Sequence, residues 1–370
     1  VRVLRALGIH PDAWHANEGH AAFMMVERIR EMVQQGVALG EAVARVGATG
    51  IFTTHTPVPA GHDSFSPEQI DRTLGQYWAE SGIDRDTFLA FGAHPHEAEG
   101  TFHMTACGMR LSRYVNGVAQ KHGQVTRENW RALWPGRPAS KIPIGHITNG
   151  VHLSSWMAWR MMDLLDEHLG RDWIGKMHDQ DLWAKVLELD DRKICDVHNQ
   201  MKGFLFNFIR EQARQRWRDE WREAVHLVGA GTLLDPYALT LGFARRFATY
   251  KRADLFFQDP ERLRRLLTNP WRPVQIVFAG KAHPADEAGK QMLHRVYSFT
   301  RDPRFEGRIA FMEDYDLSSS DRILQGVDLW VNLPVVPMEA SGTSGMKAAL
   351  NAIPQLSTLD GWWAEGYTGL

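Results

Sequence analysis

Four basic side chains within one short segment could hold phosphate groups. Arg245, Arg246, Lys251 and Arg252 follow an apolar run that is expected to form a buried strand, Ala238–Ala244. A guanidinium offers a planar pair of donors to phosphate oxygens and an ammonium offers a compact charge, so the group suits one or two phosphate dianions. A short basic run is usually a solvated turn. Its place at the carboxyl end of a strand favours a site instead, because ligands of parallel α/β sheets bind outside those ends.

A second segment combines small residues and glycines with one lysine. It reads Glu339-Ala340-Ser341-Gly342-Thr343-Ser344-Gly345-Met346-Lys347. Such residues lead from a strand into a helix, where backbone N–H groups can bind an anion. Lys347 is either a solvated side chain or, if burial lowers its pKa, an amine that attaches an aldehyde cofactor. Spacing alone leaves both readings open, and Thr343 could equally be a plain helix cap.

The histidines near the start of the chain raise the question of a metal site. His15 and His20 flank the start of a helix expected over Glu18–Gln35, without the HExxH spacing of zinc proteases. His55 and His62 lie in a loop rich in proline and glycine, where a single histidine is more often structural than catalytic. We therefore predict no metal site.

The elements after about residue 190 predict the fold class. A long helix is expected over Arg192–Arg222, and five short apolar strands then alternate with helical segments. The strands are expected at Ala238–Ala244, Val274–Gly280, Arg308–Glu313, Asp328–Leu333 and Gln355–Leu359. The helices are expected at Arg252–Thr268, Asp286–Thr300, Ser318–Gly326 and Thr343–Ala352. This alternation predicts an α/β fold with a parallel sheet covered on both faces. The Gly229-Ala230-Gly231 run lacks the third glycine of a dinucleotide motif and is rejected as one.

The first 150 residues are organised differently, with helices and loops rich in histidine, proline and glycine. A strand is expected at Ile51–Thr54, a helix at His103–Gly117 and a turn at Ile147–Val151. We place a domain boundary near Asn149–Trp156. The chain opens without methionine, inside an apolar run, and we expect it to be a piece of a longer one.

Composition narrows the class of protein further. The chain has 370 residues, enough for two or three domains, and 44% of them are apolar. The net charge of −2 disfavours a nucleic-acid partner, and no apolar run is long enough for a membrane span. Cys107 and Cys195 are the only cysteines, so we expect no disulfide framework and a reducing, cytoplasmic location.

Seven segments together resemble the α-glucan (glycogen or maltodextrin) phosphorylase family, in its shorter prokaryotic form. They are Asn17-Glu18-Gly19-His20, Thr53-Thr54-His55-Thr56, Thr148-Asn149-Gly150-Val151, Arg246 with Tyr250-Lys251-Arg252, Gly280-Lys281-Ala282, Glu313-Asp314-Tyr315 and Glu339–Lys347. The resemblance spans nearly the whole chain in order. It implies the GT-B fold, two Rossmann-like domains with the active site in the cleft between them. Residues 1–150 would be the C-terminal part of the first domain, and 151–370 the cofactor-binding second domain, incomplete at its end.

The resemblance also implies an activity and a cofactor. The reaction would be the phosphorolysis of an α-1,4-glucan to glucose-1-phosphate with retention of configuration, and pyridoxal 5'-phosphate would be bound to Lys347 as a Schiff base. Further cofactor contacts would come from Arg245, Thr343, Gly345, Tyr315 and Trp156. The implied catalytic residues are Arg246 and Lys251, which would hold the substrate phosphate, and His55. The implied glucosyl contacts are His55, Asn149, Tyr250, Glu339, Ser341 and Gly342. A homo-oligomer would be compatible with the family.

The chain differs from the family pattern in three places, and three alternative functions remain. The family often has histidine where this chain has Ala248, its residues differ from Leu333–Met338, and its glycine-rich phosphate loop is absent from these 370 residues. A nucleotide-sugar glycosyltransferase of the same fold would form no adduct with Lys347. An aminotransferase-like enzyme would need an acidic partner for the cofactor ring. A non-catalytic homologue would bind glucan without phosphorolysis.

Overall fold

The computed structural model describes residues 1–220, 228 and 230–369. They form two compact units, the first made of Val1–Asn149, Val336–Gly342 and Leu359–Leu370, the second of Gly150–Val335 and Thr343–Thr358. The chain therefore passes from one unit to the other after residues 149, 335, 342 and 358.

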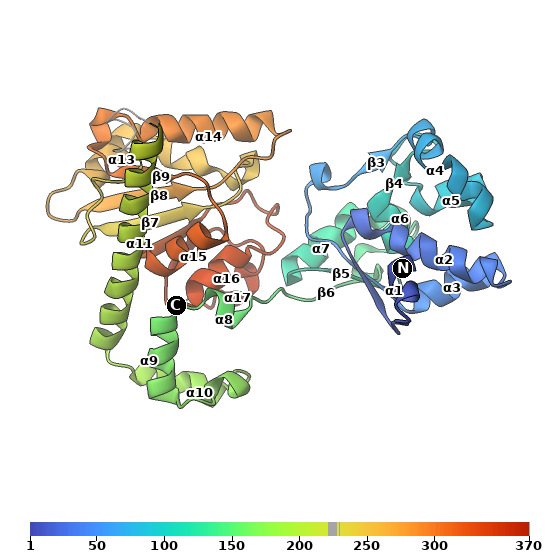
Figure 1. Cartoon of the computed structure of the whole chain (residues 1–370), viewed down its shortest axis with the longest axis horizontal. Coiled ribbons are helices and arrows are strands. Elements are labelled where there is room, and N and C mark those ends of the chain that lie inside the picture. Colours follow the sequence, from blue (N-terminus) through green and yellow to red (C-terminus); the bar gives the residue numbers. More distant parts are fainter. Residues whose placement is uncertain (221–227, 229, 370) are drawn as a thin grey trace. The chain divides into compact units, whose positions relative to one another are not determined.

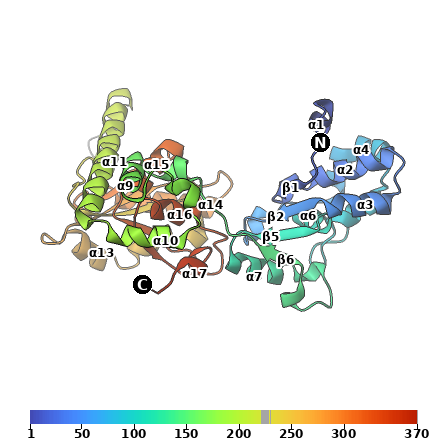
Figure 2. The ribbon, with the colours of Figure 1, turned by 90° about the horizontal axis from the view of Figure 1, so that it is seen from below.

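The first unit is built on a four-stranded parallel sheet. Its strand order is β1 (Trp14–Asn17), β2 (Gly50–Thr53), β5 (Tyr114–Gly117) and β6 (Ile144–His146), as Figure 2 shows. Asn17 is in register with Thr53, and Thr53 with Asn116, so polar side chains gather at the carboxyl end of the sheet. Phe52 is fully buried on the central strand β2, within the apolar core of this unit.

Helices surround this sheet. They are α1 (Arg2–Ala6), α2 (Phe23–Gln34), α3 (Leu39–Ala48), α4 (Pro67–Ser81), α5 (Arg85–Gly92), α6 (Met104–Arg110), α7 (Gln120–Asn129) and α17 (Trp363–Gly366). A short antiparallel pair, β3 (Ser64–Phe65) and β4 (Phe102–His103), precedes α6 along the chain. Ser66 opens α4 with a reciprocal capping box, and Gly82 closes it in the left-handed conformation.

The second unit contains the five-stranded parallel sheet that the alternation predicts. Its order is β11 (Gln355–Ser357), β10 (Leu329–Asn332), β7 (Leu239–Ala244), β8 (Val274–Ala279) and β9 (Ile309–Met312). Alternate residues of β8 enter different cores: Ile276 and Phe278 pack with α13 and α14, whereas Val277 and Ala279 pack with α11, α15 and α16. Both faces are thus covered, with the helices on either side of the sheet in Figure 1.

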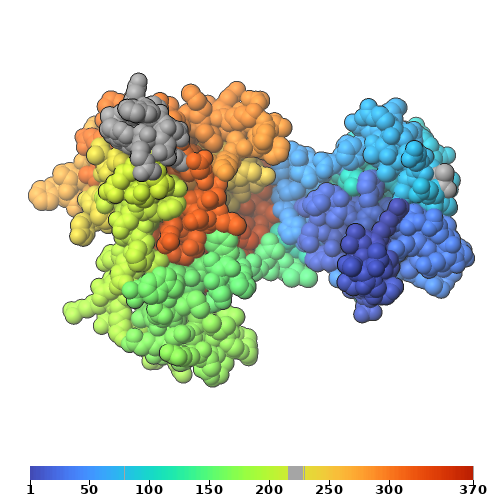
Figure 3. Space-filling view, viewed as in Figure 1, coloured from blue at the N-terminus to red at the C-terminus, as the bar shows by residue number. Residues whose placement is uncertain are grey.

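The helices of this unit are α8 (Leu153–Trp156), α9 (Trp159–Leu169), α10 (Gln180–Ala184), α11 (Asp191–Glu220), α13 (Pro260–Leu267), α14 (Glu287–Phe299), α15 (Leu317–Gly326) and α16 (Thr343–Ala349). A separate core around the fully buried Trp173 joins α9, α10 and the start of α11. This helical part is the green surface below α11 in Figure 3.

Several expected elements have different bounds. The helix expected from Glu18 begins at Phe23, because Glu18 has a left-handed backbone (φ 66°) and a short 3-10 turn follows it. The helix expected over His103–Gly117 was wrong in its second half, where Tyr114–Gly117 is β5. The expected turn at Ile147–Val151 is instead irregular chain after β6.

The second unit has smaller departures. The helix expected over Arg252–Thr268 is divided, because Asp259 caps a new helix that starts at Pro260. The end of the helix expected at Arg222 and the rejected motif at Gly229 lie outside the described residues.

Candidate functional site

The basic segment after β7 lies where the sequence predicts, directly beyond the carboxyl end of the strand. Arg245 is 7% exposed, whereas Arg246 is exposed. Lys251 is also 7% exposed, at the end of a 3-10 turn, and its Nζ lies 4.7 Å from the ring centroid of Tyr250. Two buried basic side chains thus lie beyond the carboxyl end of β7, at the edge of a parallel sheet where ligands bind.

Arg252, the fourth cation of the segment, has a structural role. Its Nε donates to the carbonyl of Leu333 at 2.6 Å, and its Nη2 donates to the carbonyl of Pro334 at 3.1 Å. It therefore ties the segment after β7 to the loop that follows the neighbouring strand β10.

Close backbone approach fixes the position of Arg245. Gly280, at the end of β8, has φ 146°, and a Cβ there would overlap the carbonyl oxygen of Arg245. Only glycine fits at this position, because any side chain would displace the residue that the resemblance places beside the cofactor phosphate.

Tyr315 lies beyond the carboxyl end of β9, beside the start of α15. Its hydroxyl is 2.9 Å from Ser320 Oγ and donates to the carbonyl of Ala244 at 3.4 Å. Burial raises the pKa of Tyr315, which keeps the phenol neutral.

Lys347 is half-buried and faces an indole ring. Its Nζ lies 3.5 Å from the ring centroid of Trp156, and burial lowers the pKa of the amine. Trp156 and Tyr315 are both partly buried against the core that contains Ala348 of α16. This environment favours the reactive-amine reading over the solvated side chain.

The residues preceding Lys347 are held by other contacts. Gln355 Nε2 donates to the carbonyl of Gly345 at 3.0 Å, which links β11 to α16. Thr343 is the first residue of the helix, and the buried hydroxyl of Ser344 has no hydrogen-bond partner among the described residues.

In the first unit, His55 is held by two residues at the end of β1. Its Nε2 lies 2.9 Å from Asn17 Oδ1, and its backbone N–H donates to the carboxylate of Glu18. Burial lowers the pKa of His55, with a further contribution from His15, and burial raises the pKa of Glu18. Our sequence reasoning did not assign roles to Asn17 and Glu18, although both stand in a segment that carries the family resemblance.

Glu339, Ser341 and Gly342 belong to the first unit, although the strand before them and the helix after them belong to the second. The backbone N–H of Glu339 donates to Asp360 Oδ2 at 2.9 Å, and the carbonyl of Ser341 accepts from Trp362 N at 2.9 Å.

The chain after β11 supports this segment. Gly361 has φ 56°, and a Cβ there would overlap the carbonyl of Ser341, so glycine is required. Lys121 on α7 donates to the carbonyl of Leu359 at 2.7 Å, which ties the same stretch to the first unit. Asn149 is held there too, because its N–H donates to the carbonyl of Val118 at 3.1 Å.

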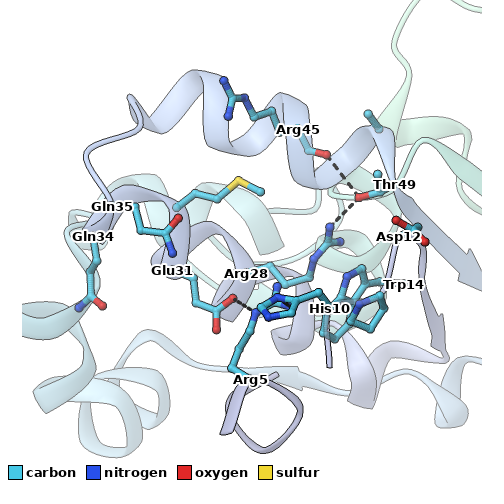
Figure 4. Close-up of a pocket in the computed structure, with 13 residues that line it drawn as sticks. Arg5, His10, Asp12, Trp14, Arg28, Glu31, Gln34, Gln35, Arg45 and Thr49 are labelled. Carbon is cyan, nitrogen blue, oxygen red and sulfur yellow. Dashed lines mark hydrogen bonds and ion pairs between the residues drawn. The ribbon is translucent and has the colours of Figure 1, made fainter. Parts of the chain in front are cut away.

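A pocket at the opposite, amino end of the first sheet has a different character. Its wall includes Trp14 and two guanidinium groups, with Arg28 5.0 Å and Arg5 5.6 Å from the indole centroid (Figure 4). Arg28 donates to Thr49 Oγ1 at 2.6 Å, and Arg5 pairs with Glu31 at 3.2 Å. Because these cations bind neighbouring protein groups, we assign Arg5 to the contact of α1 with α2 and Arg28 to the contact of α2 with the end of α3.

The described part of the chain offers neither a metal site nor a membrane span. Over residues 1–220, 228 and 230–369, no group of three or more His, Cys, Asp or Glu side chains is arranged to hold a metal ion. None of the helices in the same part of the chain has the length and apolar character needed to cross a membrane.

Parallel sheets with buried cations and a half-buried lysine beyond their strands define an α/β protein with a candidate phosphate site. The sequence model for carbohydrate phosphorylases matches residues 10–365, so the chain belongs to the carbohydrate phosphorylase family. The chain is 43% identical to the maltodextrin phosphorylase of Thermococcus litoralis over 100% of its own length and 43% of that protein's. It is 39% identical to the glycogen phosphorylase of Aquifex aeolicus, with 100% and 53% covered, and 40% identical to that of Mycobacterium bovis, with 97% and 42% covered. The chain thus spans about half the length of these relatives.

Proposed function

We propose that this chain is part of an α-1,4-glucan phosphorylase, which converts glycogen or maltodextrin and inorganic phosphate into glucose-1-phosphate with retention of configuration. The observation that carries the proposal is the Lys347 amine, half-buried against Trp156, in a unit whose sheet edge also holds Arg245 and Lys251. Family membership and the names of the relatives support it.

The residues around Lys347 fit pyridoxal 5'-phosphate. An amine whose pKa is lowered by burial is uncharged more often at neutral pH, as attachment to an aldehyde requires. The buried Ser344 hydroxyl and the cation of Arg245 offer polar groups to a phosphate. When bound, the cofactor would supply a phosphate group that exchanges a proton with the substrate phosphate. Arg245, Thr343, Gly345, Tyr315 and Trp156 would hold it, with Lys347 as its attachment point.

The remaining residues would bind and orient the substrates. Arg246 and Lys251 would hold inorganic phosphate and stabilise the charge that develops as the glycosidic bond breaks. The neutral imidazole of His55 would bind a glucosyl hydroxyl, with further contacts from Asn149, Tyr250, Glu339, Ser341 and Gly342. Placing these groups before the reaction lowers the barrier because little reorganisation is then needed.

The wider assignment belongs to the same proposal. The two units would be Rossmann-like halves of a GT-B fold with the active site in the cleft. Residues 1–150 would belong to the first half and 151–370 to the second, except that Val336–Gly342 and Leu359–Leu370 belong to the first unit. The two parallel sheets and the family support this. Both cysteines are free thiols, which supports the expected cytoplasmic location.

An absorption spectrum and an intact mass, recorded before and after borohydride reduction, test the proposal directly. We expect a cofactor band that reduction shifts, a mass increase that survives denaturation, and glucose-1-phosphate formation from maltodextrin and phosphate. In Lys347→Ala the band and the mass increase should be lost. Cofactor retained by Lys347→Ala would contradict the attachment, and glucan binding without phosphorolysis would instead favour a non-catalytic homologue.

A further inference from the structure

The side chain of Asn351 connects the backbones of the two residues that face each other at the proposed attachment site. Asn351 lies two residues beyond the end of α16 and is 2% exposed. Its Nδ2 donates to the carbonyl of Trp156 at 2.8 Å and to the carbonyl of Lys347 at 3.0 Å. Its Oδ1 accepts from the N–H of Ala158 at 2.7 Å.

These three bonds leave only one orientation for the amide. The acceptor faces an N–H, and both hydrogens of the amide nitrogen face carbonyl oxygens. A flipped amide would oppose donor to donor and acceptor to acceptor, and no other side chain of this size supplies one acceptor and two donors. Asn351 is therefore suited to this place by hydrogen bonding as well as by volume.

The bonds hold the first and last residues of the segment 156–158 and join this segment to Lys347 of α16. Ala158 is 1% exposed and Met157 is 6% exposed, so the backbone on the far side of Trp156 is anchored in the core around Trp173. With its carbonyl held by Asn351 as well, the backbone of Trp156 is fixed on both sides, and its ring packs against the core that contains Ala348. The indole then excludes water from one side of the amine.

We propose that Asn351 is a positioning residue that holds Trp156 against Lys347 and thereby keeps the amine reactive toward an aldehyde. The proposal rests on the proposed function insofar as the aldehyde is the cofactor's, but the state of the amine can be measured without any cofactor. Loss of Asn351 frees the indole, water reaches the amine, and the charged ammonium becomes more stable.

Trace acetylation of Lys347, read by peptide mass spectrometry across a pH series, measures this in the full chain. We expect Asn351→Ala to raise the pKa of the amine by about one pH unit, which lowers its acetylation rate at pH 7 about tenfold. Gln355→Ala is the matched control, because it removes a hydrogen bond to α16 without touching Trp156, and its profile should stay that of the wild type.

A double-mutant cycle separates positioning from general loosening of the fold. If Asn351 acts through the indole, Asn351→Ala should have no further effect on the pKa of Lys347 in the Trp156→Ala background.

Asn351→Asp replaces the alanine variant if that variant unfolds. At pH 7 the aspartate carboxylate repels the carbonyl oxygens of Trp156 and Lys347, and protonation of the carboxylate at low pH restores one hydrogen-bond donor. The ratio of its acetylation rate to the wild-type rate should therefore rise as pH falls.

An unchanged Lys347 profile in Asn351→Ala, or an equal shift in both Trp156 backgrounds, would overturn the proposal. A parallel reaction with pyridoxal 5'-phosphate, trapped by borohydride, tests the proposed function separately. If no label is trapped on wild-type Lys347 while Asn351→Ala still shifts the acetylation profile, the cofactor assignment fails and the positioning role stands.

Discussion

At the scale of single residues, the candidate side chains are held by partners that lie far away along the chain. Lys347 and Trp156 are far apart in the sequence, and only the fold shows the amine over the indole. Arg252 looked like one more phosphate ligand, because the charge of a side chain is visible in a sequence and its hydrogen-bond partners are not. The carbonyls that it binds come from the loop after β10, and their approach depends on the register of the sheet.

The first prediction concerns Lys251. Lys251→Ala should weaken the binding of phosphate and of glucose-1-phosphate by about 1.5–3 kcal/mol, the range for a hydrogen bond to a charged group, and should change glucan affinity little. Titration calorimetry with each ligand measures this. Lys290→Ala is the control, because Lys290 is exposed on α14 and forms an ion pair with Glu287 of the same helix. Equal loss of phosphate and glucan binding would point to misfolding instead.

The second prediction concerns the ionisation of His55. Burial lowers the pKa of His55, so the ring is neutral at pH 7. Asn17→Asp places a carboxylate where the amide oxygen lies 2.9 Å from Nε2, and an adjacent opposite charge raises a histidine pKa by about 1–3 units. Nitrogen-15 NMR of labelled histidine follows the titration, with His55→Gln to assign the signal. A His55 pKa that stays below its ordinary value in Asn17→Asp would show that the contact is absent in solution.

At the scale of elements, the alternation of apolar strands and helices in the second unit was confirmed, and the helix expected from Arg252 was the one that differed most, since α13 begins at Pro260. This prediction succeeded because a sheet covered on both faces requires strands that are apolar throughout, and such continuous apolar runs can be recognised in the sequence. β1, β5 and β6 of the first unit were missed. They are only three or four residues long and carry His, Asn and Gly, so their burial depends on neighbours that propensity cannot show.

One ion-pair network should control how firmly α11 is attached to the sheet. Lys202 is 5% exposed and donates to Asp328 Oδ2 at 2.6 Å and to the carbonyl of Ala238 at 2.7 Å. Lys202→Ala would leave the partly buried carboxylate of Asp328 without this cation, and we expect a loss of about 3 kcal/mol in unfolding free energy, the lower end of the range for a broken buried pair. Hydrogen exchange of β7 and β10 would report it. Lys193→Ala, an exposed lysine of the same helix paired with Glu167, should change exchange little.

The same network has a defined pH dependence. Burial alone would raise the pKa of Asp328, but hydrogen bonds from His198 and Lys202 bring it below its ordinary value. A carboxyl whose folded pKa is lowered stabilises the fold above its unfolded pKa, near 4, and that contribution disappears as pH falls through the folded value. Wild-type protection of β10 should therefore decrease below about pH 4. In Asp328→Asn this part of the decrease should be missing, and identical profiles would exclude Asp328 as its source.

At the scale of the whole molecule, the two units are not simple consecutive stretches of chain. The second unit needs Thr343–Thr358, which supplies the edge strand β11 and the helix α16, and Ala348 and Ile353 complete its core. The amino-acid composition does not change at the unit boundaries after residues 335, 342 and 358. These boundaries therefore cannot be predicted from the local sequence. Each segment belongs to the unit whose core or surface it packs against, and only the folded structure shows that packing.

Truncation tests this organisation. Residues 150–358 contain the whole second unit and should unfold cooperatively, whereas residues 150–335 should lose near-ultraviolet circular dichroism and bind a hydrophobic dye, because the core around Trp330 is then uncovered. The alternative outcome, equal thermal melting of the two pieces, would show that β11 and α16 are dispensable for the fold.

The repeated passage of the chain between the units also limits how genes of this family can recombine. A single crossover near residue 150 between two relatives would join the first unit's Val1–Asn149 from one parent to Val336–Gly342 and Leu359–Leu370 from the other. The contacts of Lys121 with Leu359 and of Thr148 with Glu365 would then be made by residues of different ancestry. Chimeras that keep each unit intact need breakpoints after residues 149, 335, 342 and 358. Inherited exchange of one unit alone should therefore be rare, and the segments Val336–Gly342 and Thr343–Thr358 should be inherited together.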